Sequence, residues 1–352
     1  MESGHRPQSA QLALAKLSEC KSVSNLIRPY APSSALLPCC DRLFHSAGDC
    51  ARLWKELGCD YNVVQISPGP LHGRLRVDHQ DGILLVSMQA DQALLVEGTR
   101  HPRWLPFTIE HSDNYREHRH FGESLSPHTL AGFNTKMTET LMRTSPGGNC
   151  IGAVLVDRRR VDIWADLMGA HEVSDRMEHN NKAILSPTVH RKLRQLMVLP
   201  AWQGADVPKP FQADLLEAQL IESLSPESSA LVQPVQKTHH SDLVKELVRF
   251  SFQSSTAPIS LGLVCRALFT TKTTLTVSCR EMFGYGPMAL MRRIRLQQVH
   301  EVLTSPGLRQ QIGCHTVQQA AEHFGFVSRN HFASAYRDLF AETPRTTLLA
   351  SR

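Results

Sequence analysis

The spacing of apolar residues changes along the chain, and the first spacing predicts a sheet. Between residues 61 and 109 the apolar residues form short or alternating runs, separated by turn-type clusters such as 67–70 and 78–82. Such runs are typical of short strands in an antiparallel sandwich or barrel. The predicted strands are Tyr61–Ile66, Leu71–Val77, Ile83–Met88, Ala93–Val96 and Phe107–Ile109, with a further one at Cys150–Val156.

A spacing of three and four residues, which places apolar groups on one face of a helix, is found on either side of these runs. It predicts a short helix over residues 49–57 and three later helices, at Gly132–Arg143, Ala183–Val198 and Phe211–Leu224. The apolar stripe of the last helix has two interpretations: it pairs with its copy in a dimer, or it packs on the chain's own sheet. Residues 225–240, rich in Pro, Ser and Gln, predict a linker.

The last third of the chain contains one pattern twice: a helix, a tight turn and a second helix. In the later copy, Thr316 is expected to cap the first helix, Gly325 to make the turn and Ser328 to cap the second helix. A stop follows at Thr343 and Pro344. The pattern predicts a helix-turn-helix unit.

The earlier copy has the same phasing, with expected caps at Ser260 and Thr271. Between the copies, Pro287 opens a longer helical pattern that runs to Leu303. At 1.5 Å per residue this helix spans about 25 Å, so it would hold two helix-turn-helix units at a fixed offset.

A series of short motifs marks the same region. They are Phe283-Gly284-Tyr285-Gly286-Pro287, Arg295-Leu296, Val317, Ala320-Ala321, Phe324-Gly325-Phe326-Val327-Ser328, His331-Phe332, Phe340 and Pro344. In this order and spacing they resemble the DNA-binding domain of AraC/XylS-type transcription regulators. Three positions depart from the family pattern: Phe269 stands at the first turn in place of glycine, Val299 in the long helix in place of alanine, and Cys279 in place of a bulky apolar residue.

The resemblance implies a bacterial, cytoplasmic transcription regulator that binds double-stranded promoter DNA and is not an enzyme. In this family a variable N-terminal domain, often a cupin-like β-barrel, binds a small effector and mediates dimerisation. We therefore expect a multi-domain α+β fold: a lead-in (1–38), an effector-binding and dimerisation domain (39–224), a linker (225–240) and an all-helical DNA-binding domain (241–352). RNA polymerase is a further candidate partner. No motif identifies the effector-binding residues.

Base-reading residues are expected near the start of each second helix, opposite its buried stripe. These positions match those that read bases in AraC/XylS-type domains. Arginine pairs with guanine and asparagine with adenine, whereas a lysine can instead hold a phosphate. The predicted residues are Lys272, Thr273, Thr276 and Val277 in the first unit and Arg329, Asn330 and Ala333 in the second.

Charge supports a nucleic-acid partner for the C-terminal third. The whole chain has a net charge of +5, with an ordinary 41% of apolar and 20% of charged residues. Residues 237–352 hold 14 Lys and Arg against 7 Asp and Glu, a net +7, which leaves −2 for the rest. Basic surplus of this kind neutralises phosphates. No apolar run is long enough to span a membrane, and nine scattered cysteines predict reduced thiols without a structural disulfide.

One cluster suggests a different function. His118, His120 and Glu123 form an H-x-H-x-x-E pattern, with His111 and His128 nearby. Imidazole and carboxylate groups are metal ligands, so the alternative is a metal-dependent cupin-like enzyme with a DNA-binding tail. The stretch from 111 to 123 is polar and predicts a solvated loop instead, so we expect no metal or other cofactor. A module for single-stranded nucleic acid is disfavoured because the basic region lacks interleaved exposed aromatic residues.

Overall fold

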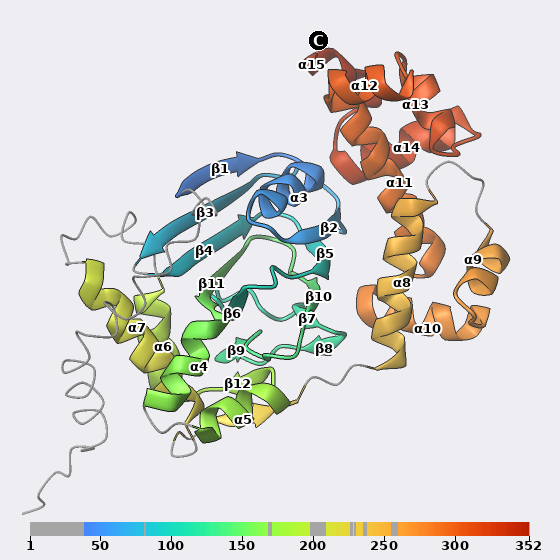
Figure 1. Cartoon of the computed structure of the whole chain (residues 1–352). Coiled ribbons are helices and arrows are strands. Elements are labelled where there is room, and N and C mark those ends of the chain that lie inside the picture. The colour runs from blue at the N-terminus through green and yellow to red at the C-terminus, as the bar shows by residue number, and fades with distance from the viewer. Residues whose placement is uncertain are drawn as a thin grey trace, which may run out of the picture.

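A computed structural model describes residues 39–80, 82–167, 171–197, 209–225, 228, 230–234, 238–254 and 260–351. The predicted lead-in over residues 1–38 lies outside them. A β-rich region is followed by a group of helices that stands beside it (Figure 1). The fold class is therefore multi-domain α+β, as predicted.

Two antiparallel sheets build the β-rich region, here called the sensor domain. The larger sheet has the order β1 (Cys40–Phe44), β3 (Gly73–Gln80), β4 (Ile83–Ala90), β11 (Asn149–Asp157), β6 (Trp104–Glu110), β9 (Thr129–Ala131), β12 (Lys182–Ile184) and β13 (Leu231–Gln233). The smaller sheet has the order β2 (Asp60–Gln65), β5 (Leu94–Thr99), β10 (Glu139–Arg143), β7 (Arg119–His120) and β8 (Glu123–Ser124). The five strands predicted between residues 61 and 109, and the one at 150–156, are all present.

The larger sheet is buried on both faces, which explains its continuous apolar runs. Along β4, Ile83 and Leu85 belong to a core under the sensor-domain helices, whereas Leu84 and Val86 belong to the core that faces the smaller sheet. Successive side chains of a strand point to opposite faces, so both faces of β4 require apolar residues.

Five helices pack on the sensor domain: α3 (Ala47–Glu56), α4 (Arg158–Leu167), α5 (His171–His179), α6 (Pro187–Leu196) and α7 (Lys209–Leu224). Helix α3 matches the helix predicted over 49–57. The apolar stripe of α7, including Leu216, Leu220 and Leu224, is buried in the core on the larger sheet. Of the two interpretations of this stripe, packing on the chain's own sheet is the one the structure has.

Of the predicted helices, the one at Gly132–Arg143 is wrong throughout and the one at Ala183–Val198 is wrong in part. The segment 132–143 ends in strand β10, because pairing with β5 and β7 on either side outweighs its local helical spacing. The segment 183–198 begins in strand β12, and only at Ser186 does a capped helix begin, which is α6. The segment predicted to be a linker contains β13, which pairs with β12.

The C-terminal region is helical. Its helices are α8 (His239–Gln253), α9 (Leu261–Ala267), α10 (Lys272–Phe283), α11 (Pro287–Thr304), α12 (Pro306–Ile312), α13 (Val317–His323), α14 (Arg329–Phe340) and α15 (Pro344–Ala350). Helices α9–α10 and α13–α14 are the two predicted helix-turn-helix units, and α11 is the long helix that joins them. The sequence patterns did not predict α8, α12 or α15.

The helical region has two separate apolar cores. One, here called the shared core, joins α8–α10 and the first half of α11 to apolar residues of the smaller sheet, such as Val64, Phe121 and Leu141. The other, the distal core, lies among α13–α15 and the second half of α11. The first helix-turn-helix unit is therefore packed against the sensor domain, whereas the second has a core of its own.

Among the described residues no helix is both long and apolar enough to cross a bilayer. The eight cysteines that the structure describes are free thiols.

Candidate DNA-reading helices and sensor cavity

The first helix-turn-helix unit begins and turns where the sequence predicts. Ser260 Oγ accepts from Leu263 N–H at 3.2 Å, and Thr271 Oγ1 accepts from Thr274 N–H at 3.1 Å, so both expected caps are present. The turn contains Phe269, whose φ is +50° and whose side chain is 97% exposed. A phenylalanine thus occupies a left-handed conformation that glycine adopts more easily.

The second unit has the stronger local signals. Thr316 and Gln319 form a reciprocal capping box at the start of α13. Gly325 makes the turn with a φ of +76°, and Ser328 Oγ accepts from His331 N–H at 3.4 Å to cap α14. Helix α14 ends before Thr343, which then caps α15, so helical structure resumes at the predicted stop.

All seven predicted base-reading side chains lie outside the cores. The exposed ones are Lys272, Thr273, Val277, Arg329 and Asn330, and the half-buried ones are Thr276 and Ala333. The opposite faces of the two helices are buried, through Leu275 and Cys279 in α10 and through Phe332 and Tyr336 in α14. Both helices therefore present the predicted positions away from their packed sides.

Two of these residues have partners within the protein. Thr276 Oγ1 donates to the Lys272 carbonyl at 2.7 Å, one turn earlier in the same helix. The guanidinium of Arg329 donates to Gln318 Oε1 on α13. Arg329 is thus positioned by both helices of its unit.

Helix α11 connects the units rigidly. Leu290 and Ile294 are fully buried in the shared core, and Leu303 is fully buried in the distal core. Its 18 residues span about 27 Å at 1.5 Å each. The predicted separation of the two units by a packed helix is confirmed.

The sensor domain contacts the carboxyl end of each second helix. Arg143 Nη1 on β10 donates to the Met282 carbonyl of α10 at 3.0 Å. Gly69 N–H, in the loop between β2 and β3, donates to the Leu339 carbonyl of α14 at 2.9 Å. The last carbonyls of a helix have no partner within it, so these donors fix each helix end to the sensor domain.

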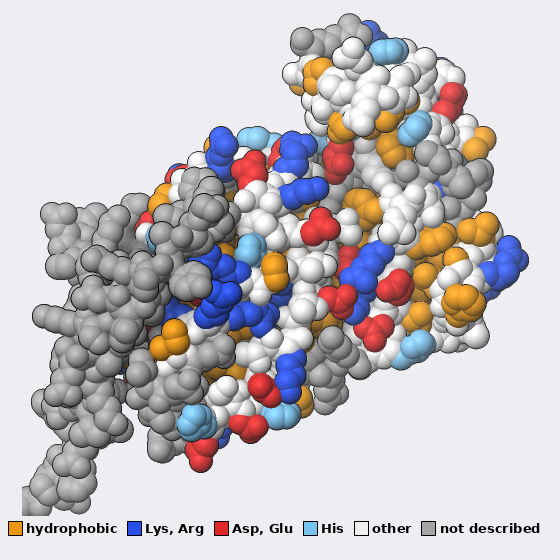
Figure 2. All heavy atoms as spheres, in the orientation of Figure 1, with side chains coloured by type: hydrophobic (Ala, Val, Ile, Leu, Met, Phe, Trp, Pro, Cys, Tyr) orange, Lys and Arg blue, Asp and Glu red, His pale blue; other side chains and the backbone are white. Residues whose placement is uncertain are grey.

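Ion pairs strengthen the same boundary. Glu139 on β10 pairs with Lys245 Nζ at 2.8 Å and with Arg249 Nη2 at 2.9 Å, both on α8. Arg249 Nε also lies 2.8 Å from Glu97, whose side chain is 0% exposed. Figure 2 shows basic and acidic side chains gathered where the helical region meets the strands. Hydrogen bonding to Lys245 and then Arg249 lowers the pKa of Glu139 to about 2.

A cavity of about 190 Å³ lies inside the sensor domain, between the two sheets. Much of its wall is apolar, with Val86, Met88, Trp104, Met142 and Leu155 among the lining residues. Polar groups reach it from the smaller sheet and its loops, including Arg100, His118, His120 and Thr140. Others come from β6 and α6, including Glu110 and Arg194.

Arg100 is the charged group most deeply buried in the cavity wall. It follows β5, its side chain is 5% exposed, and its Nε donates to Thr140 Oγ1 at 2.9 Å. Its Nη1 donates to the Gly132 carbonyl, also at 2.9 Å. The sequence patterns did not point to Arg100, because a single arginine after a strand is ordinary until the fold encloses it.

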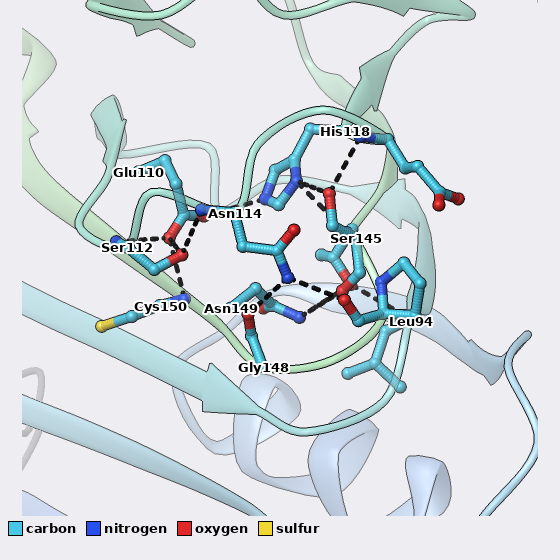
Figure 3. Close-up of polar contacts among 12 residues, drawn as sticks. Leu94, Glu110, Ser112, Asn114, His118, Ser145, Gly148, Asn149 and Cys150 are labelled. Carbon is cyan, nitrogen blue, oxygen red and sulfur yellow. Dashed lines mark hydrogen bonds and ion pairs between the residues drawn. The ribbon is translucent and has the colours of Figure 1, made fainter.

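His118 belongs to a buried polar network beside the cavity (Figure 3). Its Nδ1 accepts from Ser145 N–H at 3.1 Å and lies 2.7 Å from Ser145 Oγ. Its Nε2 lies 2.8 Å from Glu110 Oε2. Serine, histidine and glutamate are the residue types of a hydrolytic triad, but Ser145 is fully buried and is not among the residues that line the cavity. The network therefore ties loops together and offers no accessible nucleophile.

The histidine cluster does not form the solvated loop predicted from its composition. His118 is 1% exposed and His120 is also buried, because the segment folds back as β7 between β10 and β8. The three side chains also separate: His118 contacts Glu110, His120 contacts Asn181, and Glu123 pairs with Lys182. Among the described residues no group of three His, Cys, Asp or Glu side chains is placed to hold a metal ion.

Fold and site together define a class: a two-domain protein in which a β-rich domain with an internal cavity holds a pair of helix-turn-helix units. Comparison with known proteins supports the helix-turn-helix part of this class. A family model described as a helix-turn-helix domain matches residues 264–349, which include both second helices. Together with the motifs of the last third, this match supports a DNA-binding transcription regulator whose C-terminal region is similar to the AraC type.

Several solved structures are similar to the chain. A probable AraC family transcriptional regulator from Rhodopseudomonas palustris CGA009 is 29% identical, over 32% of this chain and 98% of its own, with a TM-score of 0.28. The AraC-like transcriptional activator CuxR is 13% identical, over 75% and 96%, with a TM-score of 0.38. ToxT from Vibrio cholerae O395, bound to (E)-4-(8-methylnaphthalen-1-yl)but-3-enoic acid, is 10% identical, over 84% and 99%, with a TM-score of 0.30.

Proposed function

We propose that this regulator responds to a small effector that binds in the sensor cavity, and that it reads the DNA major groove with the starts of α10 and α14. The observation that carries the proposal is the alternation of side chains along β10. Strand β10 has one face on the cavity and the other on the DNA-binding helices, so it can transmit a change from one to the other.

The two faces of β10 have different neighbours. Thr140 and Met142 line the cavity. Glu139, Leu141 and Arg143 face the helices: Glu139 pairs with α8, Leu141 lies in the shared core, and Arg143 holds the end of α10. Because strand side chains alternate, a ligand that displaces one face of β10 also displaces the other. The effector can thereby change the position of the first reading helix.

A cavity-filling substitution tests this coupling without knowledge of the effector. Met142→Trp places a larger side chain in the cavity, and Leu43→Trp, at a position 67% exposed on β1, is the matched control. We expect Met142→Trp to change the affinity of the full chain for a selected duplex by about fivefold or more, the lower range of measured allosteric coupling. The control should not change it. Unaltered affinity in a folded Met142→Trp variant would contradict coupling through β10.

The DNA-reading part of the proposal assigns base contacts to exposed residues of the two helices. Arg329 is suited to guanine, Asn330 to adenine, and Lys272 to a base or a phosphate. Arg329→Ala should cost about 1–3 kcal/mol and relax preference at one base pair. Lys272→Ala, if it removes a phosphate contact, should weaken all sequences alike and flatten the salt dependence by about one unit of slope.

Selection of binding sites from randomised duplexes by the full chain separates these outcomes. Arg345→Ala, which removes an exposed charge on α15, is the control for loss of charge alone. If Arg329→Ala lowers affinity uniformly and leaves the selected sequence unchanged, α14 does not read bases at this residue.

The remaining partners follow from the proposed role. A regulator of chromosomal promoters acts in the bacterial cytoplasm, contacts RNA polymerase when it activates, and commonly binds paired sites as a homodimer. We propose no catalytic activity, because the described polar network at Ser145 is closed to substrate. Mass measurement of the purified chain with and without duplex DNA tests the homodimer.

A further inference from the structure

The residues that line the sensor cavity indicate the chemical class of its ligand. Resting on the effector role proposed above, we propose that the effector is a compact organic acid whose carboxylate binds Arg100 and whose apolar body occupies the space between the two sheets. Four features of the cavity support this ligand: an uncompensated buried charge, free donors on that charge, a second donor beside it, and an apolar wall of limited volume.

Arg100 has no acidic partner among the described residues. Its two side-chain hydrogen bonds go to neutral acceptors, the Thr140 hydroxyl and the Gly132 carbonyl. Burial lowers the pKa of Arg100 to about 10, so the guanidinium remains charged at neutral pH. Arg158 lies close enough that its charge lowers this pKa further. A buried charge without a counter-ion is unfavourable, and an anionic ligand would remove that penalty.

Some N–H groups of Arg100 also have no acceptor among the described residues. A guanidinium carries five N–H groups, and the protein uses one on Nε and one on Nη1. Nη2 donates to no described residue. Both N–H groups of Nη2 and one of Nη1 thus have no acceptor among the described residues, and N–H groups of a planar guanidinium can receive the two oxygens of a carboxylate. A planar carboxylate with a single negative charge matches both this geometry and the single uncompensated positive charge.

His120 supplies a second donor at the same part of the wall. Asn181 Oδ1 accepts from Asn134 N–H, so the amide nitrogen of Asn181 is the atom that faces His120 Nδ1, at 3.4 Å. Nδ1 is thus the acceptor, and the proton of the neutral ring lies on Nε2. Burial, with the charges of Arg100 and Lys182, lowers the pKa of His120 to about 3, so the ring is neutral at pH 7. Nε2–H donates to no described residue and is available to a ligand.

The rest of the cavity wall determines the size and the apolar character of the part of the ligand that lies away from the carboxylate. Two indoles, two methionines and a leucine contribute most of the large apolar side chains: Trp54, Trp104, Met88, Met142 and Leu155. The cavity volume of about 190 Å³ exceeds the roughly 150 Å³ of an apolar cavity that holds benzene. An acid with a single ring or a short branched chain fits, and a long polar molecule such as an oligosaccharide does not.

Paired probes with the same carbon skeleton test the charge directly. The acids are phenylacetate, cyclohexanecarboxylate and hexanoate, and each neutral partner is the corresponding amide. Calorimetric titration and thermal melts of the full chain measure binding. We expect at least one acid to bind and its amide to bind about tenfold more weakly or worse, the difference expected for hydrogen bonds to a charged group. Phenyl phosphate is included to distinguish a phosphate site, and tighter binding of phenyl phosphate would overturn the assignment to a carboxylate.

Substitution of Arg100 provides a second test of the proposal. Arg100→Gln should remove the preference for acid over amide, whereas Arg42→Gln, an exposed arginine on β1, should retain it. The acid–amide comparison on the wild type stands whatever the stability of Arg100→Gln. Equal binding of acid and amide, or undiminished acid binding by Arg100→Gln, would overturn the proposal. If no probe binds while Met142→Trp still alters DNA affinity, the ligand class is wrong; if neither effect occurs, the effector role of the cavity itself fails.

Discussion

The two helix-turn-helix units share a plan but differ in what surrounds them. The first unit, α9–α10, is buried in a core that includes Phe121, Met137 and Leu141 of the sensor domain. The second, α13–α14, is buried among its own helices and the end of α11. Its contact with the sensor domain includes the hydrogen bonds of Gly69 and Gln65 to the Leu339 carbonyl. The first unit is therefore placed by the sensor domain, whereas the second is placed by α11.

The turns of the two units differ as well. Gly325 takes a φ of +76° in the second turn, where glycine has no steric penalty. Phe269 takes +50° in the first, where a residue with a Cβ is strained by about 1 kcal/mol. A strained turn persists when its surroundings determine it, and the shared core supplies that support. The comparison indicates that the first unit depends on tertiary contacts and the second on local sequence.

The largest effect should come from charging the two halves of α11 separately. Ile294→Asp buries a charge in the shared core and Val299→Asp buries one in the distal core, and both wild-type side chains are 0% exposed. Each should cost several kcal/mol, as unpaired buried charges do. All four tryptophans precede the C-terminal helical region in the chain, and Trp54 and Trp104 lie in the sensor domain, so fluorescence follows that domain. Circular dichroism follows helical structure, of which the C-terminal region holds the larger part. We expect Ile294→Asp to lower both melting temperatures and Val299→Asp to lower only the helical one. Equal effects of the two variants on the fluorescence transition would contradict a core shared by the first unit alone.

Loss of the ion pair at the boundary should have a smaller effect. Arg249→Gln leaves the fully buried Glu97 with Asn62, at 3.0 Å, as its remaining partner. An unsatisfied buried group of this kind costs about 1–3 kcal/mol. The measurement is chemical unfolding followed by both signals, and the control is Arg266→Gln on the exposed face of α9. If the unfolding transitions of the Arg249 variant coincide in both signals and occur at the same denaturant concentration as in the wild type, the boundary does not depend on this pair.

Acid should weaken the same boundary through Glu139. Its pKa of about 2 in the folded protein lies below the ordinary value of 4.5, so its contribution to the free energy of unfolding is complete above pH 4.5 and is lost as pH falls towards 2. Glu139→Gln should remove that part of the pH dependence. Melting temperatures of wild type and variant between pH 2.5 and pH 7 provide the test. If both melting temperatures fall equally steeply with pH below pH 4.5, the pairing with α8 does not keep Glu139 ionised.

The smallest effect on stability is expected from substitutions in the two turns. Phe269→Gly should relieve backbone strain and Gly325→Ala should introduce it, each by about 1 kcal/mol or less, with opposite signs. Thermal melts of the two single variants measure both signs. A loss of stability in Phe269→Gly would mean that the exposed ring has a contact that outweighs the strain of its backbone.

The sequence predicted the local structure of the DNA-binding region well, because each signal acts over a few residues. A capping hydroxyl such as Thr316 bonds to a backbone N–H three residues later, and a turn glycine such as Gly325 adopts its conformation without help from distant segments. The apolar strands around Ile83 and Val154 were predicted for a related reason, since burial on both faces selects a continuous apolar run. Strand β10 was not, because the residues that it pairs with on β5 and β7 lie far from it in the chain.

The chain's residues by themselves determined two helix-turn-helix units, a long helix between them, and an exposed set of candidate reading positions. Only the tertiary structure decided which unit the sensor domain holds and what its cavity offers a ligand. Arg100 and His120 belong to separate strands or loops and share no motif, and they reach one cavity because β10 lies between β5 and β7. Burial then gives Arg100 its uncompensated charge, and burial is a property of the whole fold that no short stretch of sequence contains.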